Sequence, residues 1–277
     1  MRIAETILNI IQDRGKRKLP LDDVYRQMFN PDMYLRAYAR IYKKEGAMTP
    51  GTTGETVDGM SLERIDQVIE AIRTERWKWP PARRVYIDKP KGGKRPLGIP
   101  DWSPKVVQEV IRSILEAYYE PQFSNHSHGF RPKRGCQTAL IEIINVWKGT
   151  KWFLAGDIKG CFDNIDHHTL MAILRENIRD NRFLRLIEGA LKAGYCEEWT
   201  YHPSLSGSPQ GGISTPPTKL QTFFSRVETR RRLVDPKHDI DLVLCHFNPL
   251  HQDTNQLAFA RPVRCRESVV DLCSKVL

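Results

Sequence analysis

Acidic residues and paired cysteines are scarce in this 277-residue sequence. Only 33 Asp and Glu stand against 43 Lys and Arg, so the formal net charge is +10 and the pI is about 9.4. Such an excess favours polyanionic partners, nucleic acid first and anionic membranes second. The six cysteines include no CxxC pair, which argues against a disulfide framework and against a zinc ribbon. His126 and His128 lie near Cys136, but their spacing matches no common zinc site.

Long hydrophobic runs are missing as well. No stretch of about 18 apolar residues exists, so the sequence predicts no membrane span and no membrane partner. The segment from Met1 to Gly15 has an amphipathic pattern, but it lacks the apolar core and the small-residue cleavage site of a secretory signal. We therefore expect a soluble, reduced, intracellular protein of a prokaryotic cytoplasm or an organelle, and not a secreted one.

Periodic apolar segments occupy the chain from Tyr25 to Ile213 and decay from Ser214 onward. Helical spacing predicts helices over residues 61–75, 137–147, 167–178 and 181–193, and a further helix with Ser103 as its N-cap and Pro104 at its first position. Short apolar runs predict strands over residues 85–87, 97–99, 153–158 and 198–202. Strands and helices alternate without βαβ regularity, so the predicted fold class is α+β.

A basic turn joins the first two predicted strands. Between Arg76 and Lys105 nine basic residues stand against two acidic ones. Two glycines in the turn let the backbone approach a ligand closely, and the neighbouring cations can donate to phosphate oxygens. These cations are Lys89, Lys91, Lys94 and Arg95. The same residue types also suit a solvated turn, so this segment alone leaves both interpretations open.

Three aspartates accompany the strand predicted at residues 153–158. Asp157 stands near its end, and Asp163 and Asp166 follow in the next turns of chain. Carboxylate oxygens are the ligands of a hard cation such as Mg²⁺. Asp163 and Asp166 also suit turn and helix N-cap positions, an interpretation that fits Asp166 best. Asp157 has no such local role and is the candidate metal ligand.

A glycine-rich segment from Gly207 to Gly212 is the third candidate site. Its paired glycines let backbone amides face a base or a phosphate, and the amide side chain of Gln210 can donate or accept a hydrogen bond. Taken alone, the segment indicates no more than a loop.

In their order and spacing these segments resemble the successive reverse-transcriptase blocks of group II intron-encoded proteins, the maturases of mobile introns. The blocks correspond to residues 84–100, 128–132, 157–167 and 207–213, and residues 49–60 are similar to the N-terminal extension of that subgroup. The resemblance implies the fingers and part of the palm of a right-hand polymerase, with an incomplete palm and no thumb. The regions would be an N-terminal extension (1–60), fingers and partial palm (61–213), and an aberrant, poorly ordered tail (214–277).

The resemblance also implies RNA-directed DNA polymerase chemistry at Asp157. This residue would be the catalytic carboxylate and a Mg²⁺ ligand, helped by the carbonyl of Ile158, in a two-metal nucleotidyl transfer. Phe162 would be the steric gate that excludes the 2′-hydroxyl of ribonucleotides. The full set of implied nucleotide-binding residues is Lys91, Lys94, Arg95, Arg131, Phe162 and Gln210.

RNA contacts are implied for a second group of cations, Arg83, Arg84 and Lys89. The expected partners are therefore intron RNA, an RNA template with its DNA primer, and deoxynucleotides. The sequence leaves the host intron and the oligomeric state open.

The sequence departs from the family pattern after Ile213. There the family continues with an apolar helix and a Tyr-Ala-Asp-Asp hairpin, whereas the only adjacent aspartates here are Asp22 and Asp23. One carboxylate strand cannot hold two Mg²⁺ ions, so we expect a truncated or frameshifted form without polymerase activity. The alternative functions are an RNA-binding maturase remnant and, as a third hypothesis, a basic protein with chance motifs. A polymerase assay separates the first two.

Overall fold

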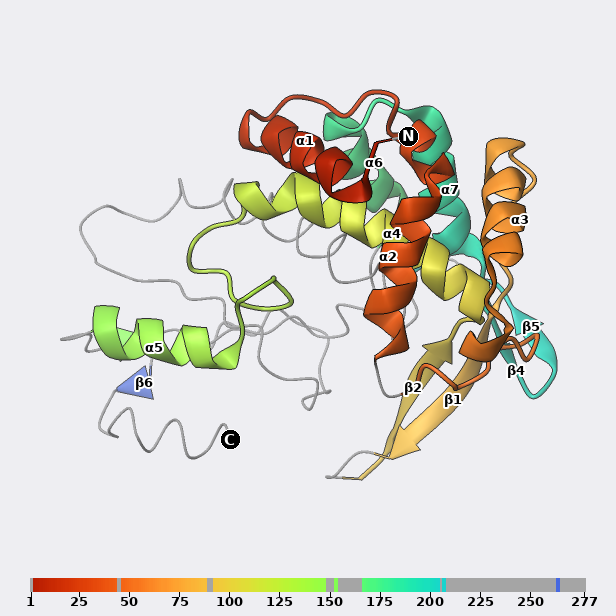
Figure 1. Cartoon of the computed structure of the whole chain (residues 1–277). Coiled ribbons are helices and arrows are strands. Elements are labelled where there is room, and N and C mark those ends of the chain that lie inside the picture. Colours follow the sequence, from red (N-terminus) through yellow and green to blue (C-terminus); the bar gives the residue numbers. More distant parts are fainter. Residues whose placement is uncertain are drawn as a thin grey trace. The chain divides into compact units, whose positions relative to one another are not determined.

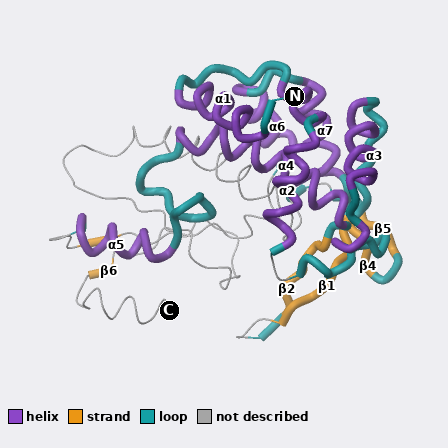
Figure 2. The backbone as a smooth tube through the Cα atoms, viewed as in Figure 1, coloured by secondary structure: helices purple, strands orange, loops and turns teal. Residues whose placement is uncertain are grey.

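The computed structural model describes residues 2–43, 46–88, 92–147, 166–204 and 206–207, together with the backbone of residues 152–153 and 263–264. The chain divides into two compact units (Figures 1 and 2). The first comprises Met1–Gln122 and Cys161–Phe223, and the second comprises Phe123–Gly160 and Phe224–Leu277. Strands and helices are mixed in the described residues, which confirms the predicted α+β class.

Helices make up most of the first unit. They are α1 (Ala4–Lys16), η1 (Val24–Phe29), α2 (Pro31–Tyr42), η2 (Val57–Gly59), α3 (Leu62–Arg73), α4 (Trp102–Tyr119), η3 (Glu120–Gln122), α6 (His167–Asn177) and α7 (Asn181–Lys192). The predicted helices at 61–75, 167–178 and 181–193 are confirmed to within two residues at each end. Ser61 caps α3, since its hydroxyl accepts a hydrogen bond of 3.1 Å from the backbone N–H of Arg64.

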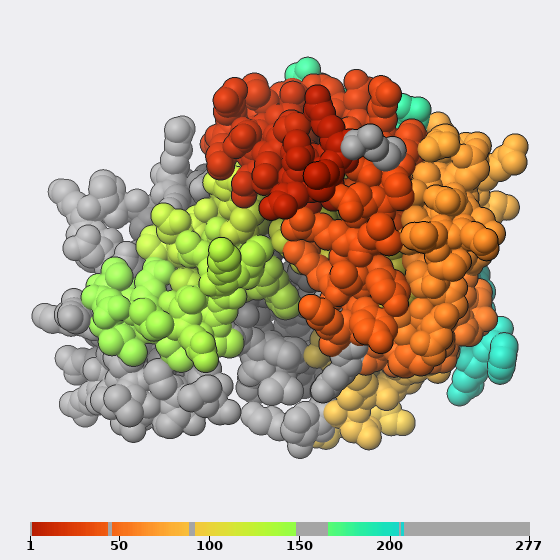
Figure 3. Space-filling view, in the orientation of Figure 1, coloured from red at the N-terminus to blue at the C-terminus, as the bar shows by residue number. Residues whose placement is uncertain are grey.

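Helix α4 forms the centre of this unit. Its predicted apolar face is fully buried, and α1 and α2 pack against it to form the outer surface seen in Figure 3. The predicted start of the helix was wrong by two residues, because α4 begins at Trp102 with Asp101 in the N-cap position. Pro104 therefore stands at the third helical position, where its missing N–H is still no loss to the helix.

A buried ion cluster joins α4 to α2. The side chain of Glu109 has no exposed surface, and its carboxylate accepts hydrogen bonds of 2.8 and 2.9 Å from the guanidinium of Arg112 and one of 3.0 Å from Arg40. Glu116 lies 2.5 Å from Arg112 and 3.8 Å from Arg40. The charges of two arginines and two glutamates thus balance each other between α2 and α4.

Gly15 marks the closest approach of α1 to α4. A Cβ atom at this position would overlap the backbone oxygen of Tyr118, so only glycine fits without movement of a helix. Alanine normally stabilises a helix interior relative to glycine. Here we expect Gly15→Ala to destabilise the protein by about 1–3 kcal/mol, because the two helices must separate.

Urea unfolding of Gly15→Ala tests this expectation against Asn9→Ala, which places a methyl on the exposed face of the same helix. The control should be neutral or slightly stabilising. A Gly15→Ala protein as stable as the wild type would show that the two helices do not approach this closely.

The sheet of the first unit has the strand order β2-β1-β4-β5. Its strands are β1 (Ala82–Asp88), β2 (Lys94–Ile99), β4 (Tyr195–Glu197) and β5 (Thr200–His202). The predicted hairpin is confirmed, since β1 and β2 are antiparallel with Tyr86 opposite Pro96. The strand predicted from residue 198 was wrong at its start, because Glu198 and Trp199 have φ of +46° and +67° and form the turn between β4 and β5.

The second unit contains α5 (Cys136–Val146) and an antiparallel pair, β3 (Trp152–Phe153) with β6 (Val263–Arg264). Helix α5 confirms the helix predicted over 137–147. Most of the strand predicted over 153–158 and of the tail from residue 214 lies outside the described residues. In the part of the chain that the structure describes, no helix is long and apolar enough to cross a membrane.

Candidate nucleic-acid interface

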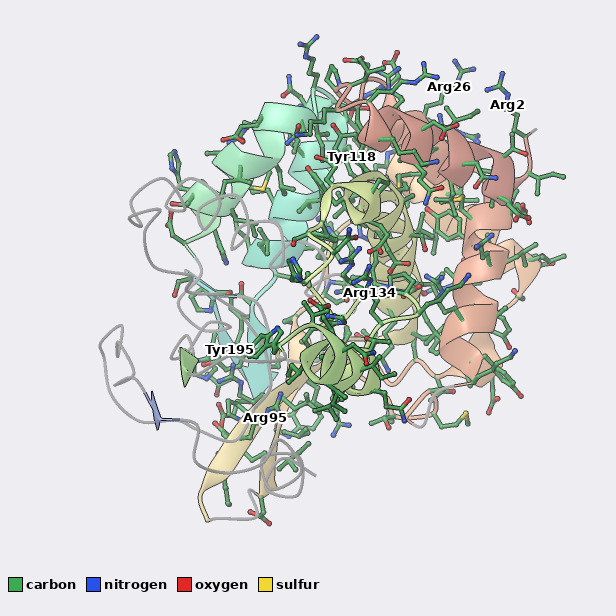
Figure 4. All side chains as sticks on the ribbon, turned by 90° about the vertical axis from the view of Figure 1, so that its left-hand side faces the viewer. Arg2, Arg26, Arg95, Tyr118, Arg134 and Tyr195 are labelled. Atoms are coloured by element: carbon green, nitrogen blue, oxygen red, sulfur yellow. The ribbon has the colours of Figure 1, made fainter. Side chains whose placement is uncertain are left out.

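The basic hairpin presents cations on both faces of its strands. Because side chains alternate along a strand, the register places Lys94 on the same face as Arg84, and Arg95 on the opposite face with Arg83. Lys94 is exposed and Arg95 is half-buried (Figure 4). The described part of the hairpin extends away from the helices of its unit (Figure 2). Lys89 and Lys91 lie outside the described residues.

Arg84 is held in place by aromatic stacking. Its guanidinium carbon lies 3.5 Å from the ring centroid of Tyr195 on β4, and that ring stacks on the imidazole of His202 at 4.9 Å and 17°. On the same face, a hydrogen bond with Glu197 raises the pKa of the Tyr86 hydroxyl, while a hydrogen bond with Arg84 opposes the shift. Arg84 is therefore a pre-positioned cation whose removal also disturbs the sheet.

Arg83 and Lys105 fix the segment before α3 at the base of the hairpin. Arg83 donates hydrogen bonds of 2.8 and 3.1 Å to the backbone oxygen of Pro50, and the ammonium of Lys105 donates one of 2.9 Å to that of Thr49. Burial lowers the pKa of Lys105. Residues of the proposed N-terminal extension thus share a framework with β1 and α4, a role of these two cations that no motif in the sequence indicated.

Arg131, predicted to lie near the nucleotide, turns into its own loop in the second unit. Its guanidinium donates hydrogen bonds of 2.7 and 2.9 Å to the backbone oxygens of Ser124 and Ser127, and it lies 5.3 Å from the ring centroid of Phe123. Only 8% of the residue is exposed. The geometry shows a loop-stabilising role, and the nucleotide contact stays a prediction.

Two histidines of the same loop meet one carboxylate on α5. Glu142 is hydrogen-bonded to the Nδ1 atom of His126 and, at 2.7 Å, to the Nε2 atom of His128. Burial acts to raise the pKa of Glu142, but the bonds from the two imidazoles outweigh it and lower the pKa overall. Thr138 completes the contact by a hydrogen bond of 2.8 Å to the Nδ1 atom of His128. Within the described ranges, no group of three His, Cys, Asp or Glu side chains could hold a metal ion.

The residues that follow the predicted catalytic segment, Asp166 and His167, are held by hydrogen bonds. Asp166 is the N-cap of α6, as interpreted from the sequence, and accepts a hydrogen bond of 2.7 Å from the backbone N–H of Thr169. His167 is buried and its Nε2 atom donates a hydrogen bond of 2.5 Å to the backbone oxygen of Gly207, which begins the glycine-rich segment. No sequence signal pointed to His167. The remaining predicted site residues lie before Asp166 or after Gly207, outside the described residues: Asp157, Ile158, Phe162 and Gln210.

The sequence of this chain is similar to those of known proteins. Residues 87–237 match the family described as reverse transcriptase (RNA-dependent DNA polymerase). The chain belongs to this reverse transcriptase family. It is 48% identical over 194 residues to the group II intron-encoded protein LtrA of Lactococcus lactis subsp. cremoris, an alignment that covers 70% of this chain and 32% of LtrA.

Two further similarities accompany the family assignment. The chain is 44% identical over 220 residues to a 91 kDa protein in the cob intron of Schizosaccharomyces pombe, which covers 77% of this chain and 27% of that protein. Among solved structures it is similar to a chain of the partial Cas6-RT-Cas1–Cas2 complex, with 20% identity, a TM-score of 0.49, and coverage of 76% of this chain and 36% of that one. The chain spans between a quarter and a third of the length of these two curated relatives.

The family assignment bears on the fold class and on the kind of ligand. The predicted fold class, the α+β fingers–palm fold of a reverse transcriptase, is confirmed. Reverse transcriptases of this kind act on nucleic acid and nucleotides, in agreement with the excess of positive charge.

Proposed function

We propose that this chain supplies the fingers and part of the palm of a group II intron reverse transcriptase, which binds intron RNA and a primed RNA template during intron mobility and splicing. The observation that carries the proposal is the β1–β2 hairpin at the edge of the sheet, which bears cations on both faces. Strand β2 lies within residues 87–237, the segment that matches the reverse transcriptase family. Lys91, Lys94 and Arg95 at its tip bind the phosphates of the incoming nucleotide or of RNA.

The catalytic residue of this proposal is Asp157, with the backbone oxygen of Ile158 as a second metal ligand. Oxygen ligands suit Mg²⁺, which when bound supplies the charge neutralisation that phosphoryl transfer needs. Phe162 excludes ribonucleotides, Gln210 supports the templating pair, and Arg131 orders the loop before α5.

The sequence lacks the Tyr-Ala-Asp-Asp motif that the resemblance implies for the rest of that metal centre. The only adjacent aspartates in the sequence are Asp22 and Asp23, and the carboxylate of Asp22 lies 3.0 Å from the guanidinium of Arg14 at the start of the chain. No step of catalysis is therefore derived from this chain alone. A function in RNA binding without polymerase activity, as in a maturase, is the second candidate and is favoured by this same gap.

Salt-dependent RNA binding tests the shared part of both functions. Each cation that neutralises a phosphate releases a counterion, so the affinity should fall steeply as the salt concentration rises. Replacing Lys91, Lys94 and Arg95 together by alanine should weaken binding to a structured RNA and flatten the slope of log K against log salt. The change should be about one unit for each phosphate that is no longer neutralised.

The matched control removes the same charge elsewhere. Arg175, Arg185 and Lys192 are exposed cations of α6 and α7, and their triple alanine variant should keep the salt slope of the wild type to within about one unit. Arg83 and Arg84 are left unchanged because they also anchor the sheet. Equal losses of affinity in the two triple variants would show that only net charge matters, and the hairpin assignment would be withdrawn.

A further inference from the structure

We propose that Phe130 is a stacking platform for an unpaired RNA base, presented by the loop of residues 123–135 in the second unit. The inference rests on the proposed function for the presence of RNA. It adds a binding site for bases that is separate from the phosphate contacts of the β1–β2 hairpin.

The conformation of Phe130 is unfavourable for the folded chain alone. The residue is 61% exposed, so most of its ring gains nothing from burial. Its φ of +57° lies in the left-handed region, which residues other than glycine rarely adopt, and Lys133 has a φ of +59°. An exposed aromatic ring on a strained backbone motivates the hypothesis that the ring contacts a ligand.

The residues on either side of Phe130 hold the loop rigid. His128 is 9% exposed and is fixed by Thr138 and Glu142 of α5, and Arg131 is 8% exposed and fixed by two carbonyls of the loop. The backbone that carries the ring is thus anchored two residues before Phe130, at His128, and one residue after it, at Arg131. A pre-ordered ring loses little conformational freedom on binding, which favours affinity.

The charge around the ring selects the ligand. Lys133 is exposed, and Arg134 (Figure 4) donates from its guanidinium to the backbone oxygen of Asn125 at the same exposed loop. The acidic group nearest in sequence to these two cations, Glu142, is already bonded to two histidines. An aromatic face next to cations suits a base and its phosphate in single-stranded nucleic acid, whereas the bases of a duplex are stacked on each other and offer no free face.

An apolar protein partner is the competing occupant. Ile141 and Ile144 on α5 are 56% and 53% exposed, and such apolar side chains together with Phe130 would suit a protein partner. Charge decides between the two, since the cores of protein–protein interfaces are depleted in lysine and this loop carries the exposed Lys133.

The test compares Phe130→Ala and Phe130→Trp in the full chain. With a short single-stranded RNA, Phe130→Ala should bind about 5- to 150-fold more weakly, the factor that corresponds to about 1–3 kcal/mol for one stacked base. Its salt slope should match that of the wild type, because every cation that meets a phosphate is still present. Phe130→Trp should restore binding, and Ile141→Ala should bind like the wild type.

An RNA with abasic sites distinguishes stacking from a structural effect. The wild type should prefer the RNA with bases, and Phe130→Ala should lose that preference while binding the abasic RNA as the wild type does. Equal losses of affinity on both RNAs, or a loss in Ile141→Ala as large as in Phe130→Ala, would overturn the stacking role. A wild type that binds no RNA would refute the proposed function as well, whereas salt-dependent binding that is indifferent to Phe130 would refute this inference alone.

Discussion

Replacing Glu109 by alanine should destabilise the first unit by about 3–5 kcal/mol, a large part of the stability of an ordinary domain. The carboxylate has no exposed surface and accepts hydrogen bonds from both Arg40 and Arg112. Its removal leaves two guanidiniums to share Glu116, one of them at 3.8 Å. Because the side chain of Arg112 is only 18% exposed, water replaces the missing carboxylate poorly.

Urea unfolding followed by far-UV circular dichroism measures this loss of stability. Glu70→Ala is the matched control, since Glu70 pairs with Arg73 on the exposed face of α3 and such pairs contribute at most about 1 kcal/mol. Glu109→Gln should fall between the two, because the amide keeps the shape and some hydrogen bonds but loses the charge. If Glu109→Ala is no less stable than Glu70→Ala, then the cluster does not hold α2 and α4 together.

The helices could be predicted from the sequence because their signals are local. The apolar spacing of α4 specifies its buried face, and Ser61 is a local cap. The exact start of α4 could not be predicted, because Asp101 is held by a hydrogen bond of 2.9 Å from the backbone N–H of Thr53, which is distant in sequence. Strand β4 was missed for a related reason, since its three residues pair in parallel with β1 and carry no pattern of their own.

At the candidate site, too, local sequence features could be predicted and tertiary contacts could not. The sequence indicated which side chains could meet phosphate, since lysine and arginine cluster near glycines in the hairpin. It could not indicate which of these cations are already engaged, because their partners are a ring on β4 for Arg84 and backbone oxygens for Arg83 and Arg131. Residue type therefore predicts the kind of ligand, whereas tertiary contacts decide which cations remain available to bind it.

A primer on an RNA template should remain unextended when this chain is supplied with Mg²⁺ and deoxynucleotides. An intact group II intron reverse transcriptase should extend the primer, whereas this chain should give no extension product. The reason is that a two-metal centre needs carboxylates from more than the Asp157 segment. Asp22 is paired with Arg14 and Asp23 precedes η1 with a φ of +50°, so this pair would have to rearrange before it bound a metal ion. Binding of the primed template should persist, since the cations of the basic hairpin need no metal ion to contact phosphate.

Gel analysis of primer extension, with an intact group II intron reverse transcriptase as the positive control, checks this result. Asp157→Ala should be indistinguishable from the wild type in extension and in template binding, because a carboxylate that completes no metal centre contributes to neither. Extension that disappears in Asp157→Ala would show that other residues of this chain close the site. In that case Asp22→Asn tests whether Asp22 and Asp23 are metal ligands. If Asp22→Asn also abolishes primer extension, then Asp22 leaves Arg14 and binds the metal ion.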